Sequence, residues 1–216
     1  MHMYQMCLGV IATNVYFLVN DETNETVIVD PADQAEKIMD HIASKGLIPK
    51  AIYLTHGHFD HILACEDLKR AYHIPVYALE DEKETLANPG QNLTEWYSDV
   101  FTISMEADRW LKDGEYLDVA GLPCEVIATP GHTPGGCCYY FPEEKILVCG
   151  DTLFEGSYGR TDFPGGSFRK LHQSMLRLFT LPDDVIALPG HGSATTIGTE
   201  KKFNAINEEG SATWFD

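Results

Sequence analysis

Basic residues are scarce in this chain of 216 residues. It has 15 lysines and arginines against 33 aspartates and glutamates, which gives a formal net charge of −18. Proteins that bind nucleic acid or anionic membranes rely largely on lysine and arginine. The shortage therefore argues against both partners and against a nuclease. The acidic excess is an ordinary route to solubility, and we infer no substrate charge from it.

Paired cysteine motifs and long apolar runs are missing as well. The six cysteines contain no C-x-x-C spacing and lie mostly in apolar runs, which is typical of buried thiols in a reducing compartment. No apolar run approaches the ~18 residues of a membrane span, and the N-terminus lacks the features of a secretory signal. We expect a cytoplasmic protein without a disulfide framework.

Strand and helix signals alternate along the chain. Apolar and β-branched runs predict strands at residues 8–11, 15–19, 26–29, 51–54, 76–79, 116–119, 125–128, 137–141, 146–149 and 185–188. Apolar residues at helical spacing predict helices over 35–46, 62–72 and 168–179, and a short last helix at Phe203 and Ile206. This order predicts one α/β (α+β) domain over residues 1–216, built from two similar halves.

Residues 80–108 are the least regular part of the chain. Loops of this length inside a compact domain are usually lids or binding loops. We expect an irregular excursion near the functional site, and we interpret the acidic residues 80–84 at its start as a solvated beginning of a helix.

Ligand-type side chains are concentrated directly after the predicted strand 51–54. His56, His58, Asp60 and His61 lie within six consecutive residues. Imidazole and carboxylate are the ligands that zinc, iron and manganese accept in proteins. In α/β sheets, ligands bind at the carboxyl ends of the strands, which is where this cluster lies. The cluster therefore indicates a metal site.

Three later loops each carry one more candidate ligand: His132, Asp151 and His191. Taken singly, each is more often a structural histidine or a turn residue than a ligand. Jointly they favour a shared metal centre, because each follows a predicted strand and has glycine or proline beside it, which allows the backbone to approach closely.

These positions resemble the metallo-β-lactamase superfamily, with the H-x-H-x-D-H motif at residues 56–61 followed by His132, Asp151 and His191. Residues 150–154 and 159–162 are similar to the hydroxyacylglutathione hydrolase (glyoxalase II) branch, in particular to its short bacterial homologues without the C-terminal helical domain. That domain supplies basic groups for glutathione, whereas Lys201 and Lys202 are the only cations after His191 here.

The resemblance implies a four-layer αβ/βα sandwich, with two facing mixed β-sheets flanked by helices and the metals at one edge between them. It implies two divalent transition metals, with zinc the first choice and iron or manganese the alternatives. Its ligand assignment is His56, His58 and His132 for the first metal, Asp60, His61 and His191 for the second, and Asp151 bridging both.

The expected function is a metal-dependent hydrolase that cleaves a thioester, such as the acyl-glutathione S-lactoylglutathione. Two metals that share a water lower its pKa from about 16 toward about 7, so a metal-bridging hydroxide can attack. Asp60 is also a candidate for handling the proton. Phe59, Tyr158 and Arg160 are candidate substrate contacts, with packing the alternative for the two aromatics and an ion pair the alternative for Arg160.

Two alternatives to the thioester hydrolase stay open. One is a mononuclear iron persulfide dioxygenase, which the resemblance would assign to His56, His132 and Asp151, a triad that leaves positions open for oxygen. The other is a non-catalytic metal-binding protein with a saturated coordination sphere. A small-molecule thioester is the one partner we expect, and the sequence does not indicate an oligomeric state.

Overall fold

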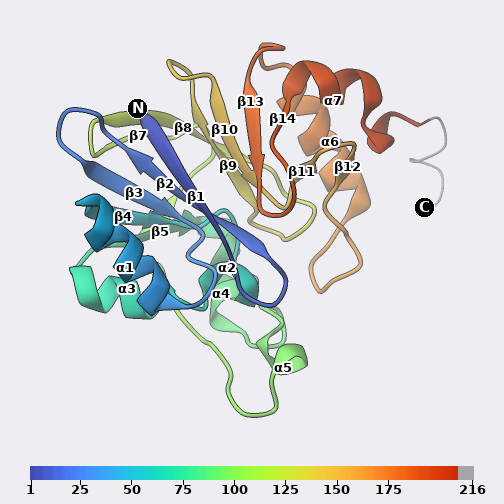
Figure 1. Cartoon of the computed structure of the whole chain (residues 1–216). Helices are drawn as coiled ribbons and strands as arrows, with labels where there is room; N and C mark the ends of the chain where they lie inside the picture. The colour runs from blue at the N-terminus through green and yellow to red at the C-terminus, as the bar shows by residue number, and fades with distance from the viewer. Residues whose placement is uncertain (209–216) are drawn as a thin grey trace.

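Two β-sheets face each other in the computed structural model, which describes residues 1–208 (Figure 1). The first sheet contains, in spatial order, β1 (His2–Leu8), β2 (Thr13–Val19), β3 (Glu25–Val29), β4 (Ile48–Tyr53), β5 (Val76–Leu79) and β6 (Arg109–Leu111). The second contains β14 (Thr195–Thr196), β13 (Ile186–Pro189), β10 (Ile146–Gly150), β9 (Cys137–Phe141), β8 (Leu122–Ala128) and β7 (Tyr116–Val119). A separate small hairpin is formed by β11 (Leu153–Phe154) and β12 (Ser157–Tyr158).

Helices cover the outer faces of both sheets. They are α1 (Ala35–Lys45), α2 (Phe59–Ile62), α3 (Cys65–Tyr72), α4 (Lys83–Ala87), α5 (Thr94–Tyr97), α6 (Phe168–Leu178) and α7 (Ile197–Phe203), with short 3-10 turns η1 (Glu80–Glu82) and η2 (Ala205–Asn207). Helices α1 and α3 lie against the first sheet, α6 lies against the second, and α5 projects below the body (Figure 1). The predicted four-layer αβ/βα sandwich is confirmed. Across residues 1–208, none of the helices has the length and apolar character that a bilayer crossing requires.

Both sheets are mixed, as expected. In the first sheet β1, β2 and β3 are antiparallel neighbours, while β3, β4, β5 and β6 run parallel. In the second, β7 to β10 are antiparallel and β10 pairs in parallel with β13. Each half thus passes from antiparallel to parallel pairing, and in parallel pairs the carboxyl ends of the strands meet at one edge.

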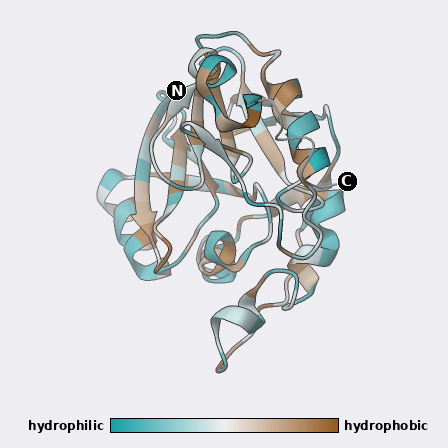
Figure 2. Cartoon of the chain, turned by 90° about the vertical axis from the view of Figure 1, so that its right-hand side faces the viewer, coloured by the Kyte–Doolittle hydropathy of each residue, from teal (hydrophilic) through white to brown (hydrophobic). Residues whose placement is uncertain are grey.

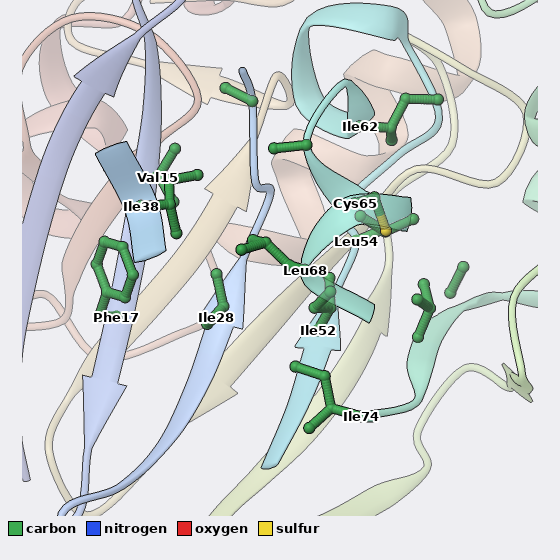
Figure 3. Close-up of a cluster of buried hydrophobic side chains, with 14 of the residues drawn as sticks. Val15, Phe17, Ile28, Ile38, Ile52, Leu54, Ile62, Cys65, Leu68 and Ile74 are labelled. Atoms are coloured by element: carbon green, nitrogen blue, oxygen red, sulfur yellow. The ribbon is translucent and has the colours of Figure 1, made fainter. Parts of the chain in front are cut away.

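The side chains of strand β2 belong to two hydrophobic cores, one on each face of the first sheet. Val15 and Phe17 point outward and pack with Ile38 of α1 (Figure 3). Tyr16 and Leu18 point to the opposite side and belong to the core between the two sheets. All seven residues of the strand are buried, because this sheet is covered on both faces. In the molecule as a whole, the apolar strands lie inside and the polar faces of the helices point outward (Figure 2).

The first predicted strand is wrong in its boundaries. Residues 8–11 were expected to be extended, but the strand β1 ends at Leu8 and the chain then turns, with Gly9 and Ala12 at positive φ. Val10 and Ile11 are exposed apolar residues of this turn. The apolar run misled the prediction, since β1 is a partly exposed edge strand whose residues alternate in burial.

Two further expectations need correction. The helix predicted over 62–72 begins only at Cys65, as α3, and it is preceded by a separate short helix, α2, that was not predicted and ends at Ile62. The acidic residues 80–84 do begin helical structure, but Glu82 is fully buried at the end of η1, so this stretch is not simply solvated. The helices expected at 35–46 and 168–179 are confirmed to within about a residue at each end.

Helix α6 carries one buried and one half-exposed leucine, and replacing each of them tests the packing of the core beneath the helix. Leu171 is fully buried among the residues that join α6 to the second sheet, whereas Leu176 is half exposed. Leu171→Ala should lower the free energy of unfolding by about 2–5 kcal/mol, because it leaves a cavity. Leu176→Ala should change it by about 0.5 kcal/mol or less. Urea denaturation of the metal-free protein measures both, and equal losses would contradict this packing.

Candidate metal centre

Four strand ends bring the candidate ligands to one edge between the sheets. His56 and His58 follow β4, His132 follows β8, Asp151 follows β10, and His191 follows β13. Strand β4 belongs to the first sheet and the other three strands belong to the second. The centre is therefore assembled from both halves of the chain.

Close backbone contacts hold the last two loops together. The Gly190 amide donates to the Gly150 carbonyl at 2.8 Å, and the Asn14 amide donates to the Gly190 carbonyl at 2.7 Å, which connects the two sheets. A Cβ atom at position 190 would lie 2.2 Å from Asp151 Oδ1 and 2.7 Å from His61 Cε1. Only glycine leaves room for both ligand-type side chains at this point.

All seven candidate ligands converge. Their nitrogen and oxygen atoms form three groups, in each of which the contributed atoms lie within 4.8 Å of one another: His56, His58 and His132; His56, His61 and Asp151; Asp60, His61 and His191. The first and third groups have the composition of the two ligand sets implied by the resemblance. Their role as ligands stays a prediction.

Asp151 lies between the two outer groups. Its Oδ1 atom is 3.5 Å from His61 Nε2, and its Oδ2 atom is 3.6 Å from His132 Nε2 and 3.4 Å from His191 Nε2. One carboxylate therefore faces imidazoles of both sets, and its role as a bridging ligand stays a prediction.

Buried polar atoms without partners indicate what the centre can hold. The Nε2 atoms of His56 and His61 and the Oδ1 atom of Asp151 are buried and have no hydrogen-bond partner among the described residues, while His58 presents its Nδ1 atom to the cluster, 2.9 Å from His132 Nε2. A buried polar atom without a partner costs free energy, so such atoms are rare and usually have a functional reason. A divalent cation fits this donor set, because nitrogen and carboxylate oxygen are its ordinary ligands.

Hydrogen bonds from outside the cluster orient several of these side chains. The carboxylate of Asp30 lies 2.9 Å from His61 Nδ1 and accepts from the Thr55 amide and hydroxyl at 2.7 and 2.6 Å. His132 Nδ1 lies 2.7 Å from the Arg160 carbonyl. The partners at Nδ1 leave the Nε2 atoms of His61 and His132 pointing into the cluster, as is usual for metal-bound histidine.

The protonation states of the two ligand sets differ. Burial lowers the pKa of His56 well below its usual value, and His61 and His58 lower it further. Burial, reinforced by His132, lowers the pKa of His58 to about 3. Burial opposes the charge on Asp60, but His61, His191 and other partners outweigh it and bring its pKa to about 2. Neutral imidazoles are the form in which histidines bind metals, and His56 and His58 have this form. Burial opposes the charge on His61 and His191, but neighbouring carboxylates, chiefly Asp60 and Asp151, outweigh it and raise the pKa of His61 well above its usual value and that of His191 to about 10. A cation bound by these two imidazoles must therefore displace a proton from each.

A cleft of about 460 Å³ opens onto the candidate ligands. The three predicted substrate contacts, Phe59, Tyr158 and Arg160, all line it. The alternative contacts also exist: Phe59 stacks on Tyr97 with ring centroids 4.3 Å apart, and the Arg160 guanidinium pairs with Asp162 at 2.6 and 2.7 Å. Contact with substrate therefore stays a prediction for all three.

The sequence interpretation missed several residues of the site. Asp30 was not among the predicted site residues, although an acidic residue at the carboxyl end of β3, beside β4, was a usable signal. Thr13 donates its hydroxyl proton to Asp60 Oδ2 at 2.7 Å, and nothing in the local sequence pointed to it. Phe163 lines the cleft and lies under the Arg160 guanidinium, 4.0 Å from the ring centroid.

The match to a family model decides the relationship. The model described as the metallo-beta-lactamase superfamily matches residues 8–191, a range that includes every candidate ligand. The chain belongs to the metallo-β-lactamase superfamily. Members of this superfamily bind divalent metals, in agreement with the donor set described above.

Relatives in the superfamily are similar over nearly the whole chain. The probable metallo-hydrolase YqgX of Bacillus subtilis is 37% identical over 93% of this chain and 94% of its own length. The hydroxyacylglutathione hydrolase GloC of Haemophilus influenzae is 37% identical over 87% of this chain and 89% of its own. The chain is thus a metallo-hydrolase of the metallo-β-lactamase superfamily.

Solved structures of the superfamily agree with the fold. The crystal structure of BLEG-1 B3 metallo-beta-lactamase has a TM-score of 0.90 at 38% identity, covering 94% of this chain and 98% of that one. The crystal structure of TTHA1623 in a di-iron-bound form has a TM-score of 0.83 at 36% identity, with the same coverage of both chains.

Proposed function

We propose that this metallo-hydrolase cleaves thioesters with two metals bound, and that an acyl-glutathione such as S-lactoylglutathione is a substrate. The observation that carries the proposal is the pair of three-residue groups on either side of Asp151, in which the Nε2 atoms of His56 and His61 are buried without a hydrogen-bond partner among the described residues. The similarity to GloC supports the choice of an acyl-glutathione. The di-iron form of TTHA1623 supports a two-metal centre, with zinc, iron and manganese as candidates here.

In this proposal His56, His58 and His132 hold one metal, Asp60, His61 and His191 hold the other, and Asp151 touches both. When bound, the metals supply Lewis acidity, which activates water near neutral pH and polarises the substrate carbonyl. No serine or cysteine nucleophile is then required.

Asp60 is the proposed proton-handling group. Its pKa of about 2 keeps the carboxylate ionised near neutral pH, and the Thr13 hydroxyl fixes the Oδ2 atom by donating to it at 2.7 Å. A fixed, ionised carboxylate in the cleft lining can accept a hydrogen bond from the attacking water and orient it, and because its low pKa makes it a weak base, it would hold a proton only transiently.

The cleft supplies the substrate contacts. Apolar side chains line it beside the ligands: Ile11, Phe59, Leu93, Phe154, Tyr158 and Phe163. These side chains would exclude bulk water from the thioester, and Arg160, the one lysine or arginine in the lining, would meet a substrate carboxylate. A saturated, non-catalytic metal site would not need such an opening onto its ligands.

Metal content measured together with a substrate panel tests the proposed function. The purified protein should contain about two transition-metal ions per chain and hydrolyse S-lactoylglutathione, and Asp151→Ala should lose both metal and activity. Elemental analysis and a panel of acyl-glutathiones, other thioesters and a β-lactam measure this. One iron per chain, with oxygen uptake on glutathione persulfide and no hydrolysis, would instead support the dioxygenase.

Replacement of Arg160 tests the substrate assignment. Arg160→Gln should raise KM for S-lactoylglutathione about tenfold with little change in kcat, because one charge-assisted hydrogen bond to a substrate carboxylate is lost. Arg70→Gln is the matched control, since Arg70 is an exposed arginine that pairs with Asp67 and does not line the cleft. Steady-state kinetics measure both variants, and an unchanged KM for Arg160→Gln would remove Arg160 from the substrate site.

A further inference from the structure

A second buried carboxylate lies behind the metal centre and is not among its candidate ligands. Glu82 is fully buried at the end of η1, in the segment between β5 and β6. A buried carboxylate is expensive unless donors compensate its charge. The positions of the donors around Glu82 therefore indicate the structural role of this side chain.

Three hydrogen-bond donors from two loops meet at Glu82. Its Oε1 atom accepts from the Gly57 amide at 2.9 Å. Its Oε2 atom accepts from the Thr133 hydroxyl at 3.0 Å and from the Gly135 amide at 2.8 Å. Burial raises the pKa of Glu82 to about 7, and these donors act against the rise.

The two loops are those that carry the first candidate ligand set. Gly57 lies between His56 and His58, and Thr133 directly follows His132. The first loop follows β4 of one sheet, and the second follows β8 of the other. We propose that Glu82 is a positioning residue of the metal centre, whose carboxylate holds these two loops in register so that the three histidines can bind one ion. This inference rests on the metal binding assumed in the proposed function.

Backbone packing agrees with this role. A Cβ atom at position 135 would lie 2.1 Å from the Glu82 amide nitrogen and 2.3 Å from the Asp81 carbonyl carbon. The turn η1 is therefore pressed directly against the loop after β8, and only glycine permits that distance. The Glu82 carboxylate therefore adds its hydrogen bonds where the main chains of the two segments are already in contact.

The second ligand set is held by other groups. Asp30 faces His61, Thr13 donates to Asp60, and the Gly190 amide bonds the Gly150 carbonyl beside Asp151. Glu82 takes part in none of these contacts. Loss of its carboxylate should therefore weaken the first site and spare the second.

Glu82→Gln tests this selectivity with little change in volume. The glutamine amide would place N–H groups against the donors of one loop, so one side of the bridge would be lost. Zinc affinity is measured by chelator competition in two backgrounds: His191→Ala, which leaves the first set intact, and His132→Ala, which leaves the second. Glu82→Gln should raise the zinc Kd about 10–100-fold in the first background and less than about threefold in the second.

Glu200→Gln provides a matched control. Glu200 is also fully buried and accepts from the Gly156 amide, the Thr195 hydroxyl and the Asn204 amide group, at 2.9, 2.6 and 2.7 Å, but none of these adjoins the first ligand set. The Glu200→Gln variant should leave the zinc Kd of the first site unchanged. Thr133→Val removes one donor to Glu82 and should weaken the first site by a smaller factor, which keeps the test decisive if Glu82→Gln does not fold.

The outcomes separate this inference from the proposed function. Equal weakening of both sites, no weakening of either, or the same effect from Glu200→Gln would overturn the role of Glu82. Selective weakening in a protein that cleaves no thioester would support Glu82 and reject only the proposed substrate. Absence of binding of zinc, iron and manganese by the unmodified protein would overturn both.

Discussion

Burying four imidazoles and their neighbouring carboxylates at one sheet edge costs free energy unless their polar atoms find partners. His56, His58, His61 and His132 are all buried, and three of their Nε2 atoms lack protein partners among the described residues. A cation is the partner that such atoms fit, and this requirement explains the surroundings of the site. Glycines stand where the loops touch, and the strands that carry the loops come from both sheets.

Hydrogen bonds from neighbouring residues support the candidate ligands, and different residues support different ligands. Asp30 and Thr13 orient His61 and Asp60, while Glu82 connects the loop after β4 to the loop after β8. Thr13 begins β2, Asp30 directly follows β3, and Glu82 ends η1, so each supporting group lies in or beside a regular element. The fold thus contributes orientation and exclusion of water, and the metals would contribute the electrophilic chemistry.

Much of the fold and of the candidate metal centre could be predicted from the sequence. The predictions that held and those that failed have different physical reasons. The ligand cluster at residues 56–61 was recognisable because four ligand-type residues in six positions have no packing explanation. The alternation of strand and helix signals predicted the α/β class, and the four layers followed from the resemblance to the superfamily. Glu82 could not be recognised, because an acidic run looks solvated until the tertiary contacts of one member are known. The strand ending at Leu8 and the split between α2 and α3 were missed because local apolar content does not reveal an edge strand or a helix break.

The central claim is that two metals lie side by side at this edge, and anomalous X-ray diffraction from crystals of the metal-loaded protein tests it most directly. The account predicts two anomalous peaks per chain, one bound by His56, His58 and His132, the other by Asp60, His61 and His191, with Asp151 in contact with both. A single peak held by His56, His132 and Asp151, with the second set of side chains free of metal, would contradict it.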